Sequence, residues 1–166
     1  MKICDVWELA RLAGAIEGEL PLRDAPRLAE PLLDTEGVLR YRLTGMTDER
    51  GRPAARLEVE GSVRARCDRC GGAVEVRIDE AVQFFFVVEE RELAALPIDE
   101  APEEPLLGSS RFDIAALVED QAILALPISP RHAACRPDWE ASEDEAARAP
   151  TQRPFAVLAA LKGRGH

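Results

Sequence analysis

Apolar and polar residues alternate with a period of two over three successive stretches between residues 37 and 88. This alternation is typical of β-strands that turn one face to a hydrophobic core and the other to solvent. Turn-forming residues separate the stretches at residues 48–53 and 67–72. We therefore predict a three-stranded antiparallel meander. Its core-facing residues are Leu39, Tyr41, Leu43, Leu57, Val59, Val63, Ala65, Val74, Val76, Ile78, Val82, Phe84, Phe86 and Val88.

The last predicted strand is apolar on both sides, since Phe85 and Val87 lie between its core-facing residues. A strand of this kind is expected to be covered on both faces or to be central in the sheet. A helix is predicted at residues 113–125, where Asp113 can cap the first turn and Pro127 follows the last. The buried face of this helix is expected to carry Ile114, Leu117, Val118 and Leu124, with Glu119 and Asp120 on or near its polar side.

The other segments are less regular. Residues 1–36 contain a short amphipathic helix near their start, but glycines and prolines break the rest into short pieces. Residues 89–112 are predicted to form an acidic, proline-interrupted loop, and residues 138–152 an acidic linker. Residues 153–162 regain helical spacing, so we expect a short C-terminal helix that docks on its own domain in preference to a partner. The predicted fold is one α+β domain over residues 1–166, an antiparallel β-meander with a packed helix and this C-terminal helix.

Composition favours an ordinary globular protein in the cytoplasm. Of 166 residues, 46% are hydrophobic and 31% are charged, which allows one domain with a hydrophobic core. No apolar run is long enough to span a membrane, and the start of the chain lacks the apolar core of a signal peptide. The formal net charge of −10 repels nucleic acid over long distances, so direct RNA binding requires a local basic patch.

Two pairs of side chains with two-residue spacing are candidate metal ligands. Cys67 and Cys70 stand at the tip of a predicted β-hairpin, while His132 and Cys135 follow the predicted helix. Zinc favours four such ligands in a tetrahedron. Three interpretations stay open, namely a zinc site, reduced thiols without a metal, and a redox dithiol. The redox dithiol ranks last, because a hairpin tip lacks the helix dipole that lowers the pKa of a redox thiol.

A basic patch is the second candidate site. Arg64 and Arg66 project from one face of a predicted strand, and Arg69 lies in the turn between the two cysteines. Arg40 and Arg42 are expected to flank them on the neighbouring strand. Guanidinium groups in such an arrangement suit phosphate contact. Judged by the residues alone, an ordinary exposed strand face with acidic cross-strand partners is the favoured interpretation.

We predict no catalytic site. The chain has no phosphate-binding loop, nucleophile elbow or dinucleotide-binding fingerprint. Its only other histidine is the last residue, His166, and its many carboxylates lie in segments without a setting that would shift their pKa values. We therefore expect that the protein is not an enzyme.

Three blocks of sequence, taken in order, resemble the YceD family of bacterial proteins, which is named for large ribosomal RNA subunit accumulation. The blocks are CDRCG at residues 67–71, then DI, VED and ILALP between residues 113 and 127 with His132 and Cys135 beyond them, and finally PFAVLAALK at residues 154–162. Together with the strands between them, the resemblance covers roughly residues 37–162. The segment before it matches only loosely.

This resemblance implies a role in the synthesis, processing or stability of the 23S ribosomal RNA, and hence in assembly of the large subunit. Family members look like non-enzymatic factors, and plant relatives with the same domain suggest direct contact with that RNA. Cys67, Cys70 and Cys135 match family positions, with His132 beside them. Many members carry additional cysteines after the proline segment, and this chain departs from the family in lacking them.

We therefore expect a ribosome-biogenesis factor that binds 23S rRNA or a pre-large-subunit particle, with Arg64, Arg66 and Arg69 as phosphate contacts. Two alternatives stay open. One is an adaptor that reaches the RNA through a basic ribosomal protein, which its acidic segments would bind. The other is a thiol redox sensor, which requires a reversible disulfide between Cys67 and Cys70.

Overall fold

The computed structural model describes residues 2–96 and 103–135. Its centre is a five-stranded sheet in which β6 runs parallel to β5 and all other neighbours are antiparallel. The strands lie in the order β2 (Ala15–Pro21), β3 (Val38–Thr47), β4 (Pro53–Arg66), β5 (Ala73–Val87) and β6 (Glu103–Leu107). The predicted meander is confirmed as β3, β4 and β5, with one further strand on either side.

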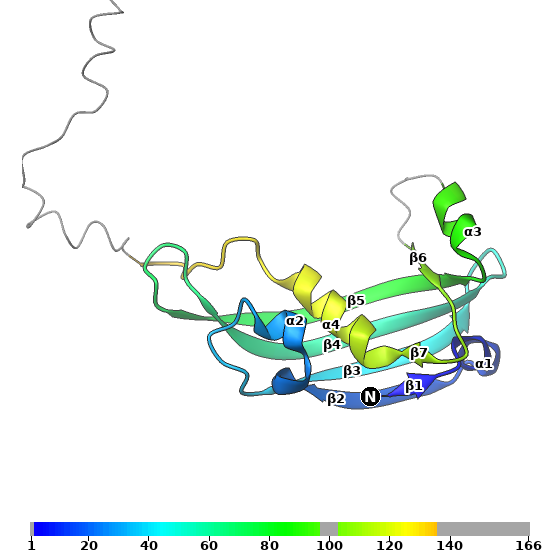
Figure 1. Ribbon diagram of the computed structural model, residues 1–166, viewed down its shortest axis with the longest axis horizontal. Coiled ribbons are helices and arrows are strands. Elements are labelled where there is room, and N and C mark those ends of the chain that lie inside the picture. Colours follow the sequence, from blue (N-terminus) through cyan, green and yellow to red (C-terminus); the bar gives the residue numbers. More distant parts are fainter. Residues whose placement is uncertain (1, 97–102, 136–166) are drawn as a thin grey trace, which may run out of the picture.

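The β4–β5 hairpin is longer than its neighbours and projects beyond them at one end of the molecule (Figure 1). Pairing between β3 and β4 stops at Glu60, and β6 pairs only with residues 83–87 of β5. The last part of β4 is instead supported by Leu33, whose backbone N–H donates to the carbonyl of Arg64 at 2.8 Å. The hairpin tip is therefore available to contact a segment from elsewhere in the chain.

The period-two pattern identified the core face of the sheet. Most of the predicted core-facing residues are buried, and Val76 and Val82 are partly buried at the border of the core. The prediction for Val88 was wrong, since its side chain is 67% exposed. β5 ends one residue earlier, at Val87, and the chain then turns away from the sheet.

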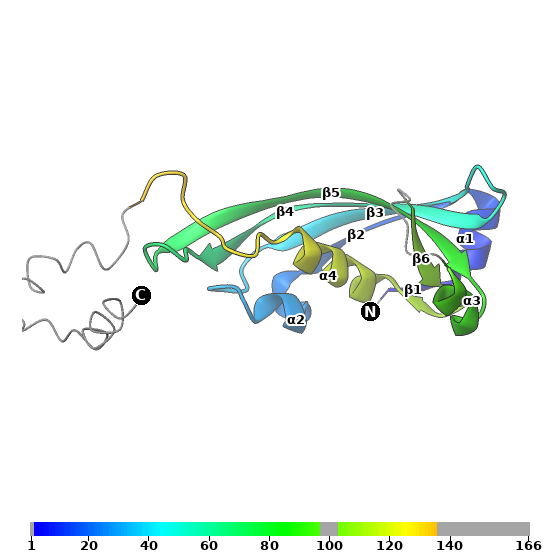
Figure 2. The same ribbon diagram turned by 90° about the horizontal axis from the view of Figure 1, so that it is seen from above.

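Shorter elements complete the described part of the chain. They are β1 (Ile3–Cys4) paired with β7 (Phe112–Asp113), α1 (Val6–Leu12), the 3₁₀ helix η1 (Leu22–Asp24), α2 (Pro26–Ala29), α3 (Glu90–Ala95) and α4 (Ile114–Ala125). Helices α2 and α4 lie on one face of the sheet, and among the described residues no helix covers most of the opposite face (Figure 2). None of the helices in the described ranges is both long and apolar enough to cross a membrane.

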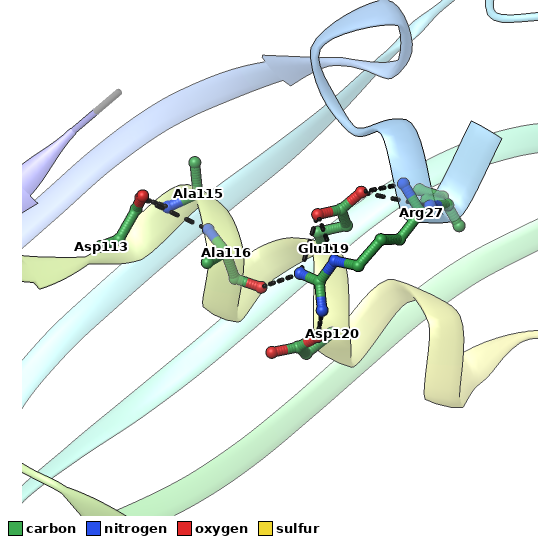
Figure 3. Close-up of polar contacts among 7 residues, drawn as sticks. Arg27, Asp113, Ala115, Ala116, Glu119 and Asp120 are labelled. Atoms are coloured by element: carbon green, nitrogen blue, oxygen red, sulfur yellow. Dashed lines mark hydrogen bonds and ion pairs between the residues drawn. The ribbon is translucent and has the colours of Figure 1, made fainter. Parts of the chain in front are cut away.

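Helix α4 begins and ends as predicted, but two of its side chains lie elsewhere than expected. The carboxylate of Asp113 accepts hydrogen bonds from the backbone N–H groups of the first turn at 3.0 and 3.4 Å (Figure 3). Leu124, predicted to be buried, is 71% exposed, because Ile123 and Leu126 are the side chains that pack on the core at this end of the helix. Glu119, predicted on or near the polar side, is only 6% exposed, because it binds the first turn of α2.

The prediction of a loop over residues 89–112 was wrong, since this range contains α3, β6 and the first residue of β7. β6 pairs with the apolar end of β5, and Glu103 on β6 accepts a hydrogen bond of 2.7 Å from Arg52. Leu93 of α3 packs on a second small apolar cluster on the other face of the sheet. The buried members of that cluster are Ala54, Phe85 and Val87. The expectation that the last strand is covered on both faces holds at this end of β5 only, since Glu75, Arg77 and Asp79 on the same face are exposed.

The N-terminal segment is more ordered than its sequence indicates. The short helix expected near its start is α1, but β2, which follows, was not predicted. Two other predictions, the linker at residues 138–152 and the helix at residues 153–162, lie outside the described residues.

Candidate metal centre

The turn between β4 and β5 places two cysteine sulfurs on the same side of the hairpin tip. The two strands stay paired up to the turn. The backbone N–H of Cys67 then donates to the carbonyl of Gly72 at 2.8 Å, and that of Gly71 donates to the carbonyl of Cys67 at 2.9 Å. Gly71 has φ = 70°, a left-handed conformation that favours glycine. The tight turn this permits brings Cys70 back toward Cys67.

The second pair of candidate ligands arrives on the segment that leaves α4. Prolines at positions 127 and 130 keep this segment extended, and it runs from α4 to the hairpin tip (Figure 1). The backbone N–H of Asp68 donates to the carbonyl of Pro130 at 2.9 Å, which joins the segment to the cysteine turn. His132 and Cys135 follow directly and face the two cysteines of the turn.

The four side chains have the geometry of a tetrahedral metal site. All four candidate ligand atoms lie within 4.8 Å of one another. The sulfurs of Cys67 and Cys135 are 3.7 Å apart, and the sulfur of Cys70 lies 3.4 Å from Nδ1 of His132. A zinc tetrahedron with Zn–S bonds of about 2.3 Å has edges of about 3.8 Å between its ligand atoms. The observed separations fit an ion at the centre of the cluster.

The hydrogen bonding of His132 supports the same interpretation. Its Nε2 lies 2.8 Å from the backbone carbonyl of Ala73. Because a carbonyl oxygen only accepts, Nε2 carries the proton and Nδ1 keeps its lone pair for the cluster. Histidines that bind metals usually donate their other N–H to a carbonyl or carboxylate in this way. The ring is therefore oriented as a ligand by the first residue of β5.

The electrostatics of the cluster concentrate negative charge on one sulfur. Burial acts to raise the pKa of Cys67, but backbone N–H groups of His132, Cys70 and Arg69 lower this pKa to about 5. Burial raises the pKa of Cys135, and the adjacent sulfurs of Cys67 and Cys70 raise it further. The pKa of His132 is raised by its hydrogen bond to the backbone and then by Cys67. A set of crowded thiols of this kind is stabilised by a cation that lets all of them ionise.

The predicted basic patch lies at the same end of the sheet, but its members differ. Arg64 is engaged, since its Nη1 lies 2.7 Å from a carboxylate oxygen of Asp34. Arg66 and Arg69 are exposed and make no ion pair with any residue in the described ranges. The two arginines nearest the cysteine turn are therefore the ones whose guanidinium groups face solvent.

The expectation that Arg40 and Arg42 flank this patch was wrong. In the observed register Arg40 stands opposite Glu60, four residues before Arg64 and therefore about 13 Å along the strand. Arg40 and Arg42 instead form ion pairs of 3.5 and 3.2 Å with glutamates of β2, an arrangement that depends on a strand the sequence did not reveal.

One further basic residue at this end escaped the sequence analysis. Arg131 is exposed and immediately precedes His132, and its Nε donates to the hydroxyl of Ser129 at 2.9 Å. In the sequence, Arg131 was marked only by its position next to the candidate ligand His132. That position does not show which residues surround Arg131, because the surroundings depend on how the segment packs against the hairpin.

Comparison with known protein families places these residues within a matched region. A family model described as "Large ribosomal RNA subunit accumulation protein YceD" matches residues 55–162. The matched range begins within β4 and contains all four clustered ligands and the arginines around them. It starts later than the resemblance noted from the sequence, which reached back to residue 37. No solved structure matches the chain.

Proposed function

The chain belongs to the YceD family of large ribosomal RNA subunit accumulation proteins, and from this premise we propose that it is a non-enzymatic ribosome-biogenesis factor. Its family name implies a role in accumulation of the RNA of the large ribosomal subunit. We propose more narrowly that it supports the synthesis, processing or stability of 23S rRNA by binding this RNA or a pre-large-subunit particle in the cytoplasm.

The observation that carries this proposal is the coincidence of a metal-ligand cluster and exposed arginines at one end of the molecule. Cys67, Cys70, His132 and Cys135 would hold zinc. With four protein ligands, such an ion has no open coordination position, so its contribution is structural and not catalytic. It would fasten the segment after α4 to the hairpin tip and so give the arginines a fixed surface.

Direct contact with RNA is proposed at Arg66 and Arg69, with Arg64 as a third contact. Exposed guanidinium groups donate to phosphate oxygens in a planar, often bidentate geometry. Arg64 is expected to contribute less, because Asp34 already accepts from its guanidinium. The acidic remainder of the chain would repel RNA elsewhere and thereby favour approach by this end.

The test is binding of the purified, metal-analysed protein to naked 23S rRNA fragments over a series of salt concentrations. Direct phosphate contact predicts binding that weakens steeply with salt. The charge-reversal variant Arg69→Glu should bind more weakly, whereas Arg11→Glu is a matched control because Arg11 lies on α1, at the other end of the sheet (Figure 1). A folded protein without affinity for any fragment would contradict direct RNA contact.

A second candidate function is an adaptor that binds a basic ribosomal protein. It is supported by the end of the sheet opposite the hairpin tip, where α3 has no buried residue and presents Glu90 and Glu92 to solvent. Complementary charge accelerates and orients such an encounter. In this case naked RNA would not bind, and a basic large-subunit protein would bind the wild type more tightly than a Glu90→Gln, Glu92→Gln variant.

A further inference from the structure

We infer that Arg131 joins Arg66 and Arg69 in one surface for the phosphodiester backbone of RNA, and that the metal centre holds the two parts of this surface together. The inference rests on the proposed direct contact with RNA and adds to it a residue and a dependence on metal. It concerns two chain segments that are far apart in the sequence and meet at the hairpin tip.

Backbone contacts bring the two segments together. The N–H of Asp68 donates to the carbonyl of Pro130 at 2.9 Å, and each of these residues is followed by an arginine, Arg69 and Arg131. The next residue in the second segment, His132, belongs to the ligand cluster. The two arginines are therefore carried by adjoining stretches of backbone, although 62 positions separate them in the sequence.

Charge at this end is opposite in sign to that of the whole chain. Residues 64–75 and 126–135 together contain four arginines and only two carboxylates, whereas the formal net charge of the protein is −10. One of the four arginines, Arg64, is paired with Asp34, which leaves three guanidinium groups without an ion pair to any residue of the described ranges. A polyanion is the partner that such a locally basic end of an acidic protein attracts.

The ligand cluster ties the geometry of this surface to metal. Arg69 lies between the ligands Cys67 and Cys70, and Arg131 directly precedes the ligand His132. Neither arginine is itself a candidate ligand. Loss of the metal would therefore leave every arginine in place and remove the ligand bonds that, beside the hydrogen bond from Asp68 to Pro130, keep Arg131 at the turn. A phosphate chain that contacts both segments at once would then lose one set of contacts.

Salt dependence of RNA binding provides the test, because it counts phosphate contacts. The full-length, zinc-loaded protein is titrated with a fluorescent 23S rRNA fragment at several salt concentrations, and the slope of log K against log salt is compared between variants. Each phosphate contact contributes about 0.7 to 0.9 to this slope. We expect Arg131→Ala and Arg69→Ala each to reduce the slope by about one contact. Arg11→Ala, which removes the same charge from α1, should leave it unchanged.

The role of the metal is tested with the same fragment. In the Cys135→Ser variant, or after chelation, Arg131→Ala should no longer change the slope, while Arg69→Ala still should. Circular dichroism confirms that the sheet is intact in the form compared. The His132→Cys variant, which retains four ligands, should keep the contribution of Arg131 and serves as the second measurement if ligand loss unfolds the protein.

The outcomes separate this inference from the proposed function. If Arg69→Ala lowers the slope and Arg131→Ala behaves like Arg11→Ala, the inference is overturned and direct RNA contact stands. If Arg131 keeps its contribution in the metal-free, folded protein, the metal dependence is overturned. If the wild type does not bind naked RNA, both the inference and direct contact fail.

Discussion

Glu119 on α4 and Arg27 on α2 are joined by both backbone and side-chain hydrogen bonds across 92 positions of sequence (Figure 3). One carboxylate oxygen accepts the backbone N–H of Arg27 at 2.7 Å and that of Leu28 at 3.1 Å. The other accepts from Nε and Nη2 of the Arg27 guanidinium at 3.0 and 2.8 Å. A single acidic side chain thus caps α2 and fastens the N-terminal segment to the helix that leads to the metal ligands.

This arrangement predicts that Glu119→Gln destabilises the fold. The neutral amide would remove one of the two carboxylates that the guanidinium contacts and place an N–H₂ group against a donor, so we expect the free energy of unfolding to fall by about 1–3 kcal/mol. Asp120→Asn is the matched control, because Asp120 contacts the same guanidinium but its side chain is 49% exposed. Urea denaturation of both variants measures the difference. An equal decrease in the free energy of unfolding in the two variants would show that the buried contacts of Glu119 stabilise the fold no more than the exposed contact of Asp120.

Acid should weaken the protein through its buried carboxylates. Burial acts to raise the pKa values of Glu119 and Asp48, but hydrogen bonds from backbone N–H groups and from Arg27 and Arg52 respectively lower them below their usual 4.5 and 3.8. The unfolded chain therefore takes up protons at a higher pH than the folded one, so stability decreases as the pH falls.

We expect the free energy of unfolding from these two groups to be constant above about pH 5 and to decline below about pH 4. Urea denaturation at a series of pH values checks this. The decline should be shallower in Glu119→Gln, because the titrating group is gone. A profile that has the same slope in both proteins over this range would exclude Glu119 as a source of acid sensitivity.

Removal of one ligand should release zinc and loosen the fold. Cys67→Ser is expected to lose the bound metal and to melt roughly 10 °C lower. Structural zinc contributes several kcal/mol to the free energy of unfolding, and each kcal/mol corresponds to a shift of about 2–4 °C in the melting temperature of a chain of this size. Cys4→Ser is the control, because Cys4 lies on β1 and is not a member of the ligand cluster. Metal analysis and thermal melting are measured together. Wild-type protein without zinc, or an unchanged melting temperature in Cys67→Ser, would remove the zinc hypothesis.

The histidine position should tolerate a thiol better than a methyl group. His132→Cys would retain four ligands and hence zinc, whereas His132→Ala would weaken zinc binding by at least the 10–100-fold that loss of an outer-shell partner costs. Competition with a chromogenic chelator measures both affinities. Equal affinities in the two variants would mean that His132 lies near the cluster without binding the metal.

Local patterns in the sequence predicted the parts of this protein that depend on local physical chemistry. Alternation within 37–88 predicted β3, β4 and β5, because one buried face imposes a period of two on each strand. Asp113 predicted the start of α4, since a carboxylate in this position satisfies the free N–H groups of the first turn. The spacing of the cysteines predicted a turn with two sulfurs on one side.

Elements whose stability comes from distant partners were missed. β6 contains two glutamates and a proline, and nothing in its own composition favours a strand. It forms because the apolar end of β5 offers an edge and Arg52 binds Glu103. Glu119 was placed on or near a polar face for the same reason, because its partner on α2 is invisible in the sequence around it.

The sequence by itself determined the strands of the meander, the main helix and the identity of four candidate ligands, since each of these depends on residues within a few positions of one another. Only the tertiary structure decided that the two ligand pairs meet, that Asp34 engages Arg64 and that Arg131 adjoins the cysteine turn. These contacts depend on strand register and on the path of the segment after α4. The register and the path are both set by packing of the whole core, and a short stretch of sequence does not determine that packing.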